Sequence, residues 1–378
     1  MLEWNVEIIG LYAIGAFGFL WLVRMLYVFC LYLRPLLRIS KKEKSAFLPT
    51  DTPPVSVVVI ALNKGAEFIR NIEKILAQQY PCFEVIVVID NADKDVEDEL
   101  KLLMHTDSRV RYTFVPHETK SVSRRKLALI IALKAARYDW ILQTEYSCYP
   151  SSDKWMARMV NARTESTEIV LGGTVSESLP AGIRRTMNYF DLLKSLEMLS
   201  CGIYNLPYVG NSANLLLQKE LLFKHISFGK SLKEELGEDL VLVNTAATDK
   251  NLAVELNSES LTVNSLLDKE DWTVRYTSAK RCRKLLGGFG KTLWKMSSVF
   301  SFLYFVALVF AVVMQLHSVL FLSVIGGMHI LYRCSFWTIL LCYSNKTRSV
   351  RFYTLPFYSR LLLPFVGSRK RSIIRRRK

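Results

Sequence analysis

The sequence predicts an α/β domain with a doubly wound, mostly parallel β-sheet, flanked near both ends by membrane-spanning segments. Between residues 55 and 145, four short runs of strand type alternate with segments of helical spacing, which is the pattern of repeated βαβ units. Outside that region lie long apolar stretches, and 51% of the 378 residues are hydrophobic. This apolar share, together with stretches of bilayer length, predicts a membrane protein.

The first element is an apolar stretch at residues 8–33 that only Arg24 interrupts. It is long enough to cross a bilayer. Because no small-residue cleavage site follows it, we expect a retained anchor and not a signal peptide, with a buried core helix as the alternative. Residues 1–34 are therefore predicted to be a transmembrane anchor and residues 35–54 a basic linker.

The central domain, residues 55–298, begins where the composition changes. The runs "VSVVVIALN", "EVIVVID", "RVRYTFVP" and "DWILQTE" are rich in apolar and β-branched residues, as expected of strands covered on both faces. Three segments between them have helical spacing: "EFIRNIEKILAQQ", "VEDELKLLMH" and "RRKLALIIALKAARY". In such a sheet the ligand site lies at the carboxyl ends of the strands. The residues expected there are Asn63, Lys64, Asp90, Asn91 and Glu145 to Ser147.

A transmembrane hairpin is predicted at residues 299–343, because two apolar stretches in this range are separated by a short turn at residues 316–318. Arg333 lies inside the second stretch, where an arginine faces a protein partner or reaches toward a lipid headgroup. Residues 352–366 form a shorter apolar segment with basic flanks, which predicts a helix in the membrane interface. We assign it, with the basic tail, to residues 344–378.

The formal net charge is +16, and the basic residues cluster beside the membrane segments in "RPLLRISKKEK" and "SRKRSIIRRRK". Both clusters are expected on the cytoplasmic side, where anionic headgroups attract them, so the central domain should face the cytoplasm. This distribution disfavours a nucleic-acid-binding protein. The seven cysteines show no close Cys-x-x-Cys pair, and the five histidines are dispersed. Reduced thiols are therefore expected, without disulfides or a zinc site.

Five motifs give the chain a family resemblance. In order, they are "PPVSVVVIALN", "EVIVVIDNADKD", "KLALIIALKAARYDWILQTEYSCYP", "YVGNSANLL" and "GEDLVLV". Together with the membrane segments, they make the chain resemble the membrane-bound family 2 glycosyltransferases. The resemblance implies a GT-A fold and an inverting transfer of sugar from a nucleotide-sugar donor to a glycan or lipid-linked acceptor. It also implies cell-surface polysaccharide assembly at the bacterial inner membrane, beside a membrane lipid and another membrane subunit.

The resemblance assigns the donor site to residues at the strand ends. Asp90 matches the aspartate that contacts the nucleotide base or ribose, and Asn63 lies on the first nucleotide-binding loop. Lys126 matches a basic residue near the donor, and Glu145 stands in the family's metal motif.

The acceptor side is assigned in the same way. Asp239 matches the catalytic base, with Glu238 beside it, because a carboxylate can remove the proton of an attacking hydroxyl. Taken alone, Asp239 could equally cap a helix. Gly210 and Asn214 match the loop that shapes the sugar and acceptor pocket.

The chemical face departs from the family pattern. The usual Asp-x-Asp is "TEYSC" here, so Glu145 keeps one charge while Ser147 is neutral, and binding of Mg²⁺ or Mn²⁺ should be weakened. Lys64 replaces the first-loop acid, and Ile89 replaces the first of two adjacent aspartates. In the Gln-x-x-Arg-Trp-type segment Arg275 stands at the glutamine position and Ser278 at the arginine position, unless a register shift brings Lys280 or Arg281 there.

Two hypotheses follow from these departures. In the first, Lys64, Lys126, Arg275 and Arg281 neutralise the diphosphate in place of a metal, and the chain is an active transferase. In the second, catalysis is lost, and the chain binds a partner enzyme or a glycolipid. Because Asp90 and Asp239 are both present, the sequence favours the first.

Overall fold

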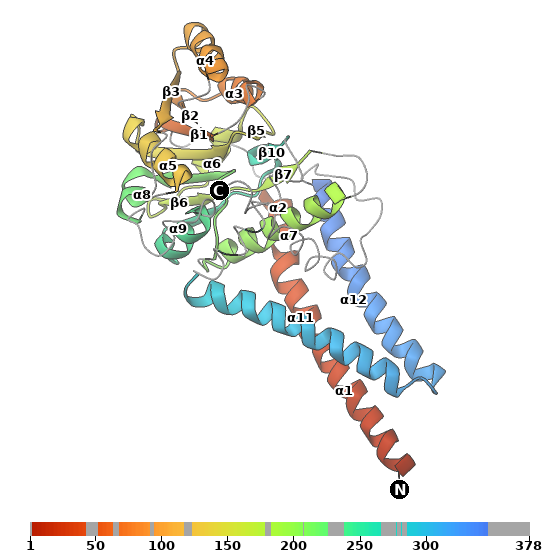
Figure 1. Ribbon diagram of the computed structural model, residues 1–378. Helices are drawn as coiled ribbons and strands as arrows, with labels where there is room; N and C mark the ends of the chain where they lie inside the picture. The colour runs from red at the N-terminus through yellow and green to blue at the C-terminus, as the bar shows by residue number, and fades with distance from the viewer. Residues whose placement is uncertain are drawn as a thin grey trace.

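The computed structural model describes residues 2–42, 52–62, 68–90, 94–116, 123–177, 183–206, 208–225, 238–265, 277, 281 and 286–346. An α/β domain lies at one end of the molecule, and three long helices extend from it to the other end (Figure 1). The predicted fold class, a mostly parallel α/β sheet accompanied by long apolar helices, is confirmed.

The four predicted strands form one half of a seven-stranded sheet of order β3-β2-β1-β4-β8-β6-β9. They are β1 (Val55–Ala61), β2 (Phe83–Asp90), β3 (Val110–Val115) and β4 (Trp140–Glu145). The pairings among these four strands are all parallel. Every residue of β1, β2 and β4 is buried, as their continuous apolar runs predict. The helices α3 (Ile69–Leu76), α4 (Lys94–Thr106) and α5 (Arg124–Ala135) connect these strands.

The other half of the sheet is mixed. Strand β8 (Leu215–Gln218) runs antiparallel to β4 and to β6 (Ile169–Leu171), and β9 (Leu252–Val254) pairs parallel to β6. These strands are three or four residues long, too short to show a period in the sequence, and our strand predictions did not include them. The helices α8 (Lys219–His225) and α9 (Glu238–Ala246) follow β8 in the chain.

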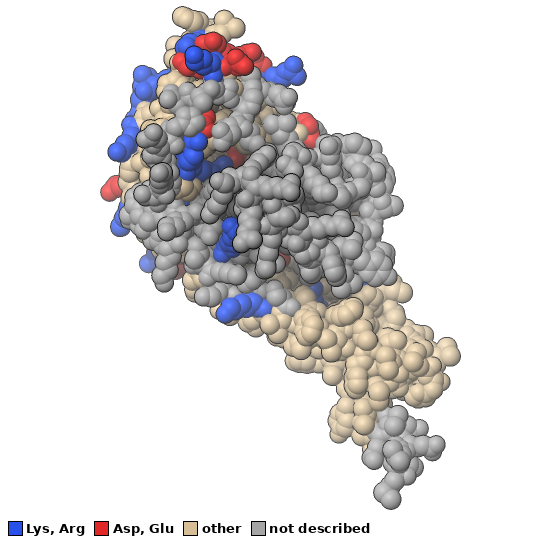
Figure 2. All heavy atoms as spheres, viewed as in Figure 1, with Lys and Arg blue, Asp and Glu red and all other residues tan. Residues whose placement is uncertain are grey.

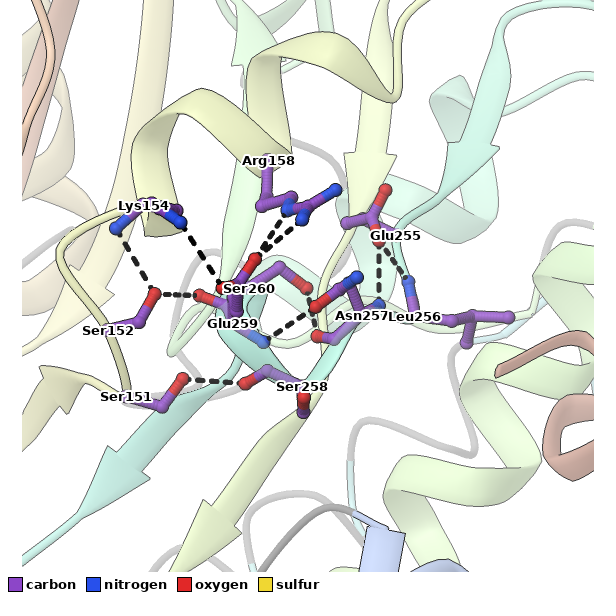
Figure 3. A network of polar contacts seen from close by, with 10 residues as sticks. All are labelled: Ser151, Ser152, Lys154, Arg158, Glu255, Leu256, Asn257, Ser258, Glu259 and Ser260. Carbon is purple, nitrogen blue, oxygen red and sulfur yellow. Dashed lines mark hydrogen bonds and ion pairs between the residues drawn. The ribbon is translucent and has the colours of Figure 1, made fainter. Parts of the chain in front are cut away.

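A second, three-stranded sheet begins with the strand that follows β4 in the sequence. It contains β5 (Cys148–Pro150), β10 (Thr262–Asn264) and β7 (Thr174–Ser176), in the order β5-β10-β7. A polar network fixes its position (Figure 3): Arg158 of α6 (Trp155–Asn161) donates to the Glu259 carboxylate at 2.6 and 2.8 Å. The hydroxyls of Ser151 and Ser152 donate at 2.8 Å to the carbonyls of Ser258 and Glu259. The segment that follows β5 is therefore anchored to the segment that precedes β10.

The long helices match the predicted membrane segments. Helix α1 (Leu2–Val28) continues through a π-helical turn, η1 (Phe29–Leu33), into α2 (Arg34–Lys42), and α11 (Gly288–Met314) and α12 (Val319–Lys346) form a hairpin. Their stretches Ile8–Arg38, Lys295–Met314 and Val319–Asn345 are long and apolar enough to cross a membrane. The predicted interfacial segment, residues 352–366, lies outside the described residues.

Helix α7 (Ile183–Ile203) joins the domain to the first long helix. The Tyr32 hydroxyl of η1 donates to the Glu197 carboxylate of α7 at 2.7 Å. On α7, Leu196 and Leu199 belong to the same buried cluster as Tyr32 and the sheet residue Val58. One apolar core thus runs from the sheet through α7 into the long helices.

Candidate functional site

Two carboxylates lie at the carboxyl edge of the parallel strands. Asp90 ends β2, Glu145 ends β4, and β1 pairs with both strands between them. The two side chains are only 3% and 5% exposed. The sheet therefore brings these two predicted site residues to one edge, because parallel strands on either side of β1 end at the same level.

Two consecutive arginines at the start of α5 neutralise these acids. Arg124 Nη2 donates to Asp90 Oδ1 at 2.6 Å, and Arg125 Nη2 donates to Glu145 Oε1. Buried carboxylates require such partners, since an uncompensated charge in a low-dielectric interior is strongly unfavourable. The first turn of a helix disfavours cations, so the two acids explain why arginines are tolerated there.

Sequence reasoning missed Arg124 and Arg125 and chose their neighbour Lys126. Lys126 is also buried on α5, with a relative exposure of 7%. A signal was present: three successive basic residues open a helix, where the macrodipole is unfavourable, directly opposite strand ends that carry acids. Such a run indicates paired side chains more strongly than a single lysine does.

Glu145 has a second partner from a third part of the chain. The Ser212 hydroxyl donates to Glu145 Oε1, and Arg125 Nη2 lies 3.2 Å from the same hydroxyl. The neighbouring Thr144 hydroxyl donates to the Ala213 carbonyl at 3.0 Å. We call Arg125, Glu145 and Ser212 the arginine triad. The strand end, the helix start and the "GNSANLL" segment are thereby held together.

The described residues at this edge do not fit a divalent metal. Mg²⁺ and Mn²⁺ require several hard oxygen ligands, usually including carboxylates. Glu145 Oε1 is instead hydrogen-bonded to the guanidinium of Arg125 and the hydroxyl of Ser212, and Ser147 is fully buried against Cys148, 3.9 Å away. Among the residues that the structure describes, no three His, Cys, Asp or Glu side chains are grouped to hold a metal. Among the described residues, the cation beside Glu145 is the guanidinium of Arg125.

Asn214 is buried and fully engaged within the fold. Its Nδ2 donates to the carbonyls of Gly173 and Ser260, both at 2.8 Å, and its Oδ1 accepts from Trp155 Nε1 at 3.0 Å. A Cβ atom on Gly172 would overlap the Asn214 amide, so only glycine fits there. Gly210, in the same segment, is also buried. In this arrangement Asn214 holds the segment that carries Ser212.

The remaining predicted site residues are only partly visible. Asn63, Lys64, Asn91, Arg275, Ser278 and Lys280 lie outside the described residues. Glu238 and Asp239 open α9, but their side chains are not described. Arg281 is exposed, and Ile89 is buried within β2. Their predicted roles therefore stay predictions.

Comparison with known proteins shows a likeness to one family over the part of the chain that carries this edge. Residues 56–211 match the model of glycosyl transferase family 2, a range that includes Asp90, Glu145 and Gly210 but ends before Asn214 and Asp239. No curated protein matches the sequence.

A solved structure shares the fold. A mannosyltransferase from Pyrobaculum calidifontis, in complex with GDP-mannose and Mn²⁺, has a TM-score of 0.52 and 16% sequence identity over 88% of this chain and 99% of that one. S. aureus TarS, residues 1–349 in complex with UDP-GlcNAc, has a TM-score of 0.41 and 18% identity over 58% of this chain and 60% of that one. The first of these likenesses shows a common fold that extends over the long helices as well as the domain.

Proposed function

Because residues 56–211 match the model of glycosyl transferase family 2, we propose that this chain transfers a sugar from a nucleotide-sugar donor to an acceptor held at a membrane. The observation that carries the proposal is the pair of buried carboxylates, Asp90 and Glu145, at the carboxyl edge of β2 and β4. In α/β sheets this edge is where nucleotides bind.

The donor would bind across the first turn of α5. Asp90 can accept hydrogen bonds from the base or ribose, while the guanidinium groups of Arg124 and Arg125 match the geometry of phosphate oxygens. Without donor, the two arginines are neutralised by Asp90 and Glu145. As the nucleoside diphosphate departs, negative charge develops on its terminal phosphate, and a preorganised cation such as Arg125 stabilises that charge.

Asp239, at the start of α9, would be the catalytic base, with Glu238 beside it. It removes the proton from the acceptor hydroxyl while the hydroxyl oxygen forms a bond to the anomeric carbon. The bond between that carbon and the phosphate oxygen breaks, and its electron pair leaves with the nucleoside diphosphate. Attack from the face opposite the leaving group inverts the configuration. Gly210 and Asn214 would shape the pocket for the sugar.

The three long helices support a location in the membrane. They are long and apolar enough to cross it, and the apolar core connects them to the domain through α7. With the basic segments on the cytoplasmic side, the domain would face the cytoplasm of a bacterial inner membrane. A lipid-linked acceptor in surface polysaccharide assembly fits this placement better than a soluble one.

A second candidate function is a non-catalytic subunit that binds a partner enzyme or a glycolipid. The specific observation in its favour is the arginine triad, in which the acid of the metal motif is already engaged within the fold. Transfer and binding can be separated by experiment.

The test uses the full chain in lipid nanodiscs, with GDP-mannose and UDP-GlcNAc as donor probes. We expect donor binding and release of nucleoside diphosphate, and loss of release but not of binding in Asp239→Asn. Asp249→Asn is the matched control, because Asp249 is exposed in the turn after α9. Binding without release in the unmodified chain would support the non-catalytic subunit. Binding of neither donor would overturn both functions for these donor classes.

A further inference from the structure

We propose that the long helices hold the phosphate group of an anionic membrane lipid at a polar cluster formed by Arg24, Tyr304, His329, Tyr332 and Arg333. This inference rests on the proposed membrane location and not on glycosyl transfer. The five residues, named here the intramembrane cluster, come from all three long helices: α1, α11 and α12.

The cluster is tied together by short contacts. Arg24 Nη2 donates to the Tyr332 hydroxyl at 2.8 Å, and the Tyr304 hydroxyl lies 2.9 Å from His329 Nδ1. The rings of Tyr304 and Tyr332 are 5.5 Å apart, and the Arg24 guanidinium carbon lies 5.6 Å from the centre of the Tyr332 ring. Arg333 directly follows Tyr332 on α12.

The cluster carries positive charge without a carboxylate in the membrane segments. Residues 8–33, 299–315 and 319–343 contain Arg24 and Arg333 but no Asp or Glu. Arg24 is only 6% exposed, yet its Nε and Nη1 have no hydrogen-bond partner among the described residues. Glu197, the acid that contacts the first long helix, accepts from Tyr32 instead. A guanidinium in apolar surroundings requires a counter-ion, which therefore has to come from outside these three segments.

The depth of the cluster indicates which counter-ion can reach it. A Cβ atom on Gly10 would touch the Gln315 amide, so Gly10 lies level with the tip of the α11–α12 hairpin. Arg24 follows Gly10 by about four helical turns, or about 21 Å along α1. In a hydrocarbon core of about 30 Å, this places Arg24 in the leaflet nearest the α/β domain, within reach of its headgroups for a long side chain.

The chemistry of the cluster selects phosphate. Two guanidinium groups and phenol hydroxyls are hydrogen-bond donors, and a guanidinium fork binds phosphate oxygens in a bidentate manner. In Figure 2 the part of the long helices that lies farthest from the α/β domain is tan where it is described, whereas most of the Lys, Arg, Asp and Glu side chains in view lie on the α/β domain. A soluble anion would have to cross the apolar spans of the long helices, but a lipid of the nearest leaflet presents its phosphate within reach of a long side chain at this depth. An anionic lipid also brings the missing negative charge, which a zwitterionic lipid neutralises with its own ammonium group.

The test measures lipids that remain bound to the full chain after extraction in mild detergent from vesicles of phosphatidylglycerol and phosphatidylcholine. We expect mass spectrometry to show enrichment of phosphatidylglycerol on the unmodified chain. In Arg24→Met the enrichment should fall about tenfold, the equivalent of about 1.4 kcal/mol. Arg38→Met is the matched control, because Arg38 is exposed beyond α1, and it should retain the lipid.

Each other outcome would overturn the site. Equal enrichment in Arg24→Met would show that the cluster does not bind the lipid, and an equal loss in Arg38→Met would reveal diffuse attraction to basic residues. The ligand is free phosphate if inorganic phosphate displaces the lipid, or if it raises the melting temperature of the chain as much as phosphatidylglycerol does. Should Arg24→Met fail to fold, Tyr332→Phe removes only the Arg24 hydrogen-bond partner and should still lower the enrichment.

Extraction of the chain by carbonate would refute the membrane location itself, and donor turnover measured in parallel keeps the two proposals separate.

Discussion

At the scale of single residues, the most informative contact is that between Arg125 and Glu145. Glu145 is buried, Arg125 is partly buried, and Ser212 joins them, so the only acid of the "TEYSC" motif is held by a cation that belongs to the chain. A guanidinium carries a positive charge and donates directional hydrogen bonds. It can therefore stabilise and orient a departing diphosphate, as a bound metal ion does. This contact leads to two predictions.

The first concerns metal removal. Because Arg125 is the cation beside Glu145, we expect release of nucleoside diphosphate to change less than about twofold between excess EDTA and excess Mn²⁺, a difference below about 0.5 kcal/mol in activation free energy. Steady-state rates of the full chain in nanodiscs measure this. Strong inhibition by EDTA that Mn²⁺ reverses would contradict the assignment.

The second concerns Arg125 itself. We expect Arg125→Met to lower the rate constant of transfer by about 100-fold, the magnitude typical of losing one preorganised electrostatic contact in a transition state. Arg125→Lys should recover part of the rate, because it keeps the charge but lacks the planar fork. Arg163→Met serves as control, since Arg163 stacks on Trp140 and lies outside the triad. An unchanged rate in Arg125→Met would exclude Arg125 from the reaction.

At the scale of elements, short polar connections set the geometry of the site. The strands β5 to β10 are only three or four residues long, so side chains such as Asn214 and Glu259 fix segments that strand pairing alone would not. Buried polar groups of this kind contribute strongly because each lost partner leaves another group unsatisfied.

Asn214→Ala should therefore destabilise the domain by about 3 kcal/mol or more, since it leaves the Trp155 N–H and the carbonyls of Gly173 and Ser260 without their partner. Urea unfolding followed by domain fluorescence measures the free energy. Gln79→Ala, at an exposed hydrogen bond, should cost no more than about 0.5 kcal/mol. A cost for Asn214→Ala as small as that of the control would refute the positioning role.

The turn between α4 and β3 gives a dependence on pH. Hydrogen bonds from the Arg109 side chain hold the pKa of Asp107 below its ordinary value of 3.8, and Arg109 also donates to the Leu76 carbonyl at 3.0 Å. A carboxylate whose pKa is lowered in the folded state stabilises the fold at pH values above its ordinary pKa. This contribution is lost as the pH falls through the lowered pKa of the folded state.

Asp107→Asn should consequently destabilise the domain by about 1 kcal/mol at neutral pH, and the difference from the unmodified chain should shrink as the pH falls below about 4. Unfolding free energies over this pH range check the sign. Asp98→Asn is the control, because Asp98 is exposed and its ion pair with Lys101 lies at the surface. A difference that grows in acid would contradict the assignment.

At the scale of the whole molecule, the domain and the long helices share one core. Phe17, Tyr32 and Tyr304 belong to the same buried cluster as Leu199 of α7 and Val58 of β1. The domain and the first long helix are therefore not independent units, because part of the apolar surface of the domain is buried against α1, η1 and α2.

A chain that begins at residue 52 should expose the face of α7 that packs on η1 and α2, since Leu31, Tyr32 and Leu36 would be missing. Exposed apolar patches of this kind cause aggregation. We expect the shortened chain to be insoluble, or to lose its near-UV circular dichroism, even in detergent. A soluble, cooperatively unfolding product would show that the domain is independent.

Much of this architecture could be predicted from the sequence. Continuous β-branched runs encode strands that are covered on both faces, so β1, β2 and β4 and the helices between them appear where expected. Long apolar stretches encode the three long helices in the same way. The position of Asp90 and Glu145 at strand ends followed as well, because strand direction fixes which residue comes last.

The choice of partners depended on the tertiary structure. Successive residues of a helix point in directions about 100° apart, so only the packing of α5 on the sheet decides that Arg124 contacts Asp90 and Arg125 contacts Glu145. Ser212 joins Glu145 from 67 positions away, and Arg24 meets Tyr332 across 308 positions. The sequence determined the strands, the long helices and the charges they carry. Which charge neutralises which was decided only by tertiary packing, because pairing depends on distances that local patterns do not contain.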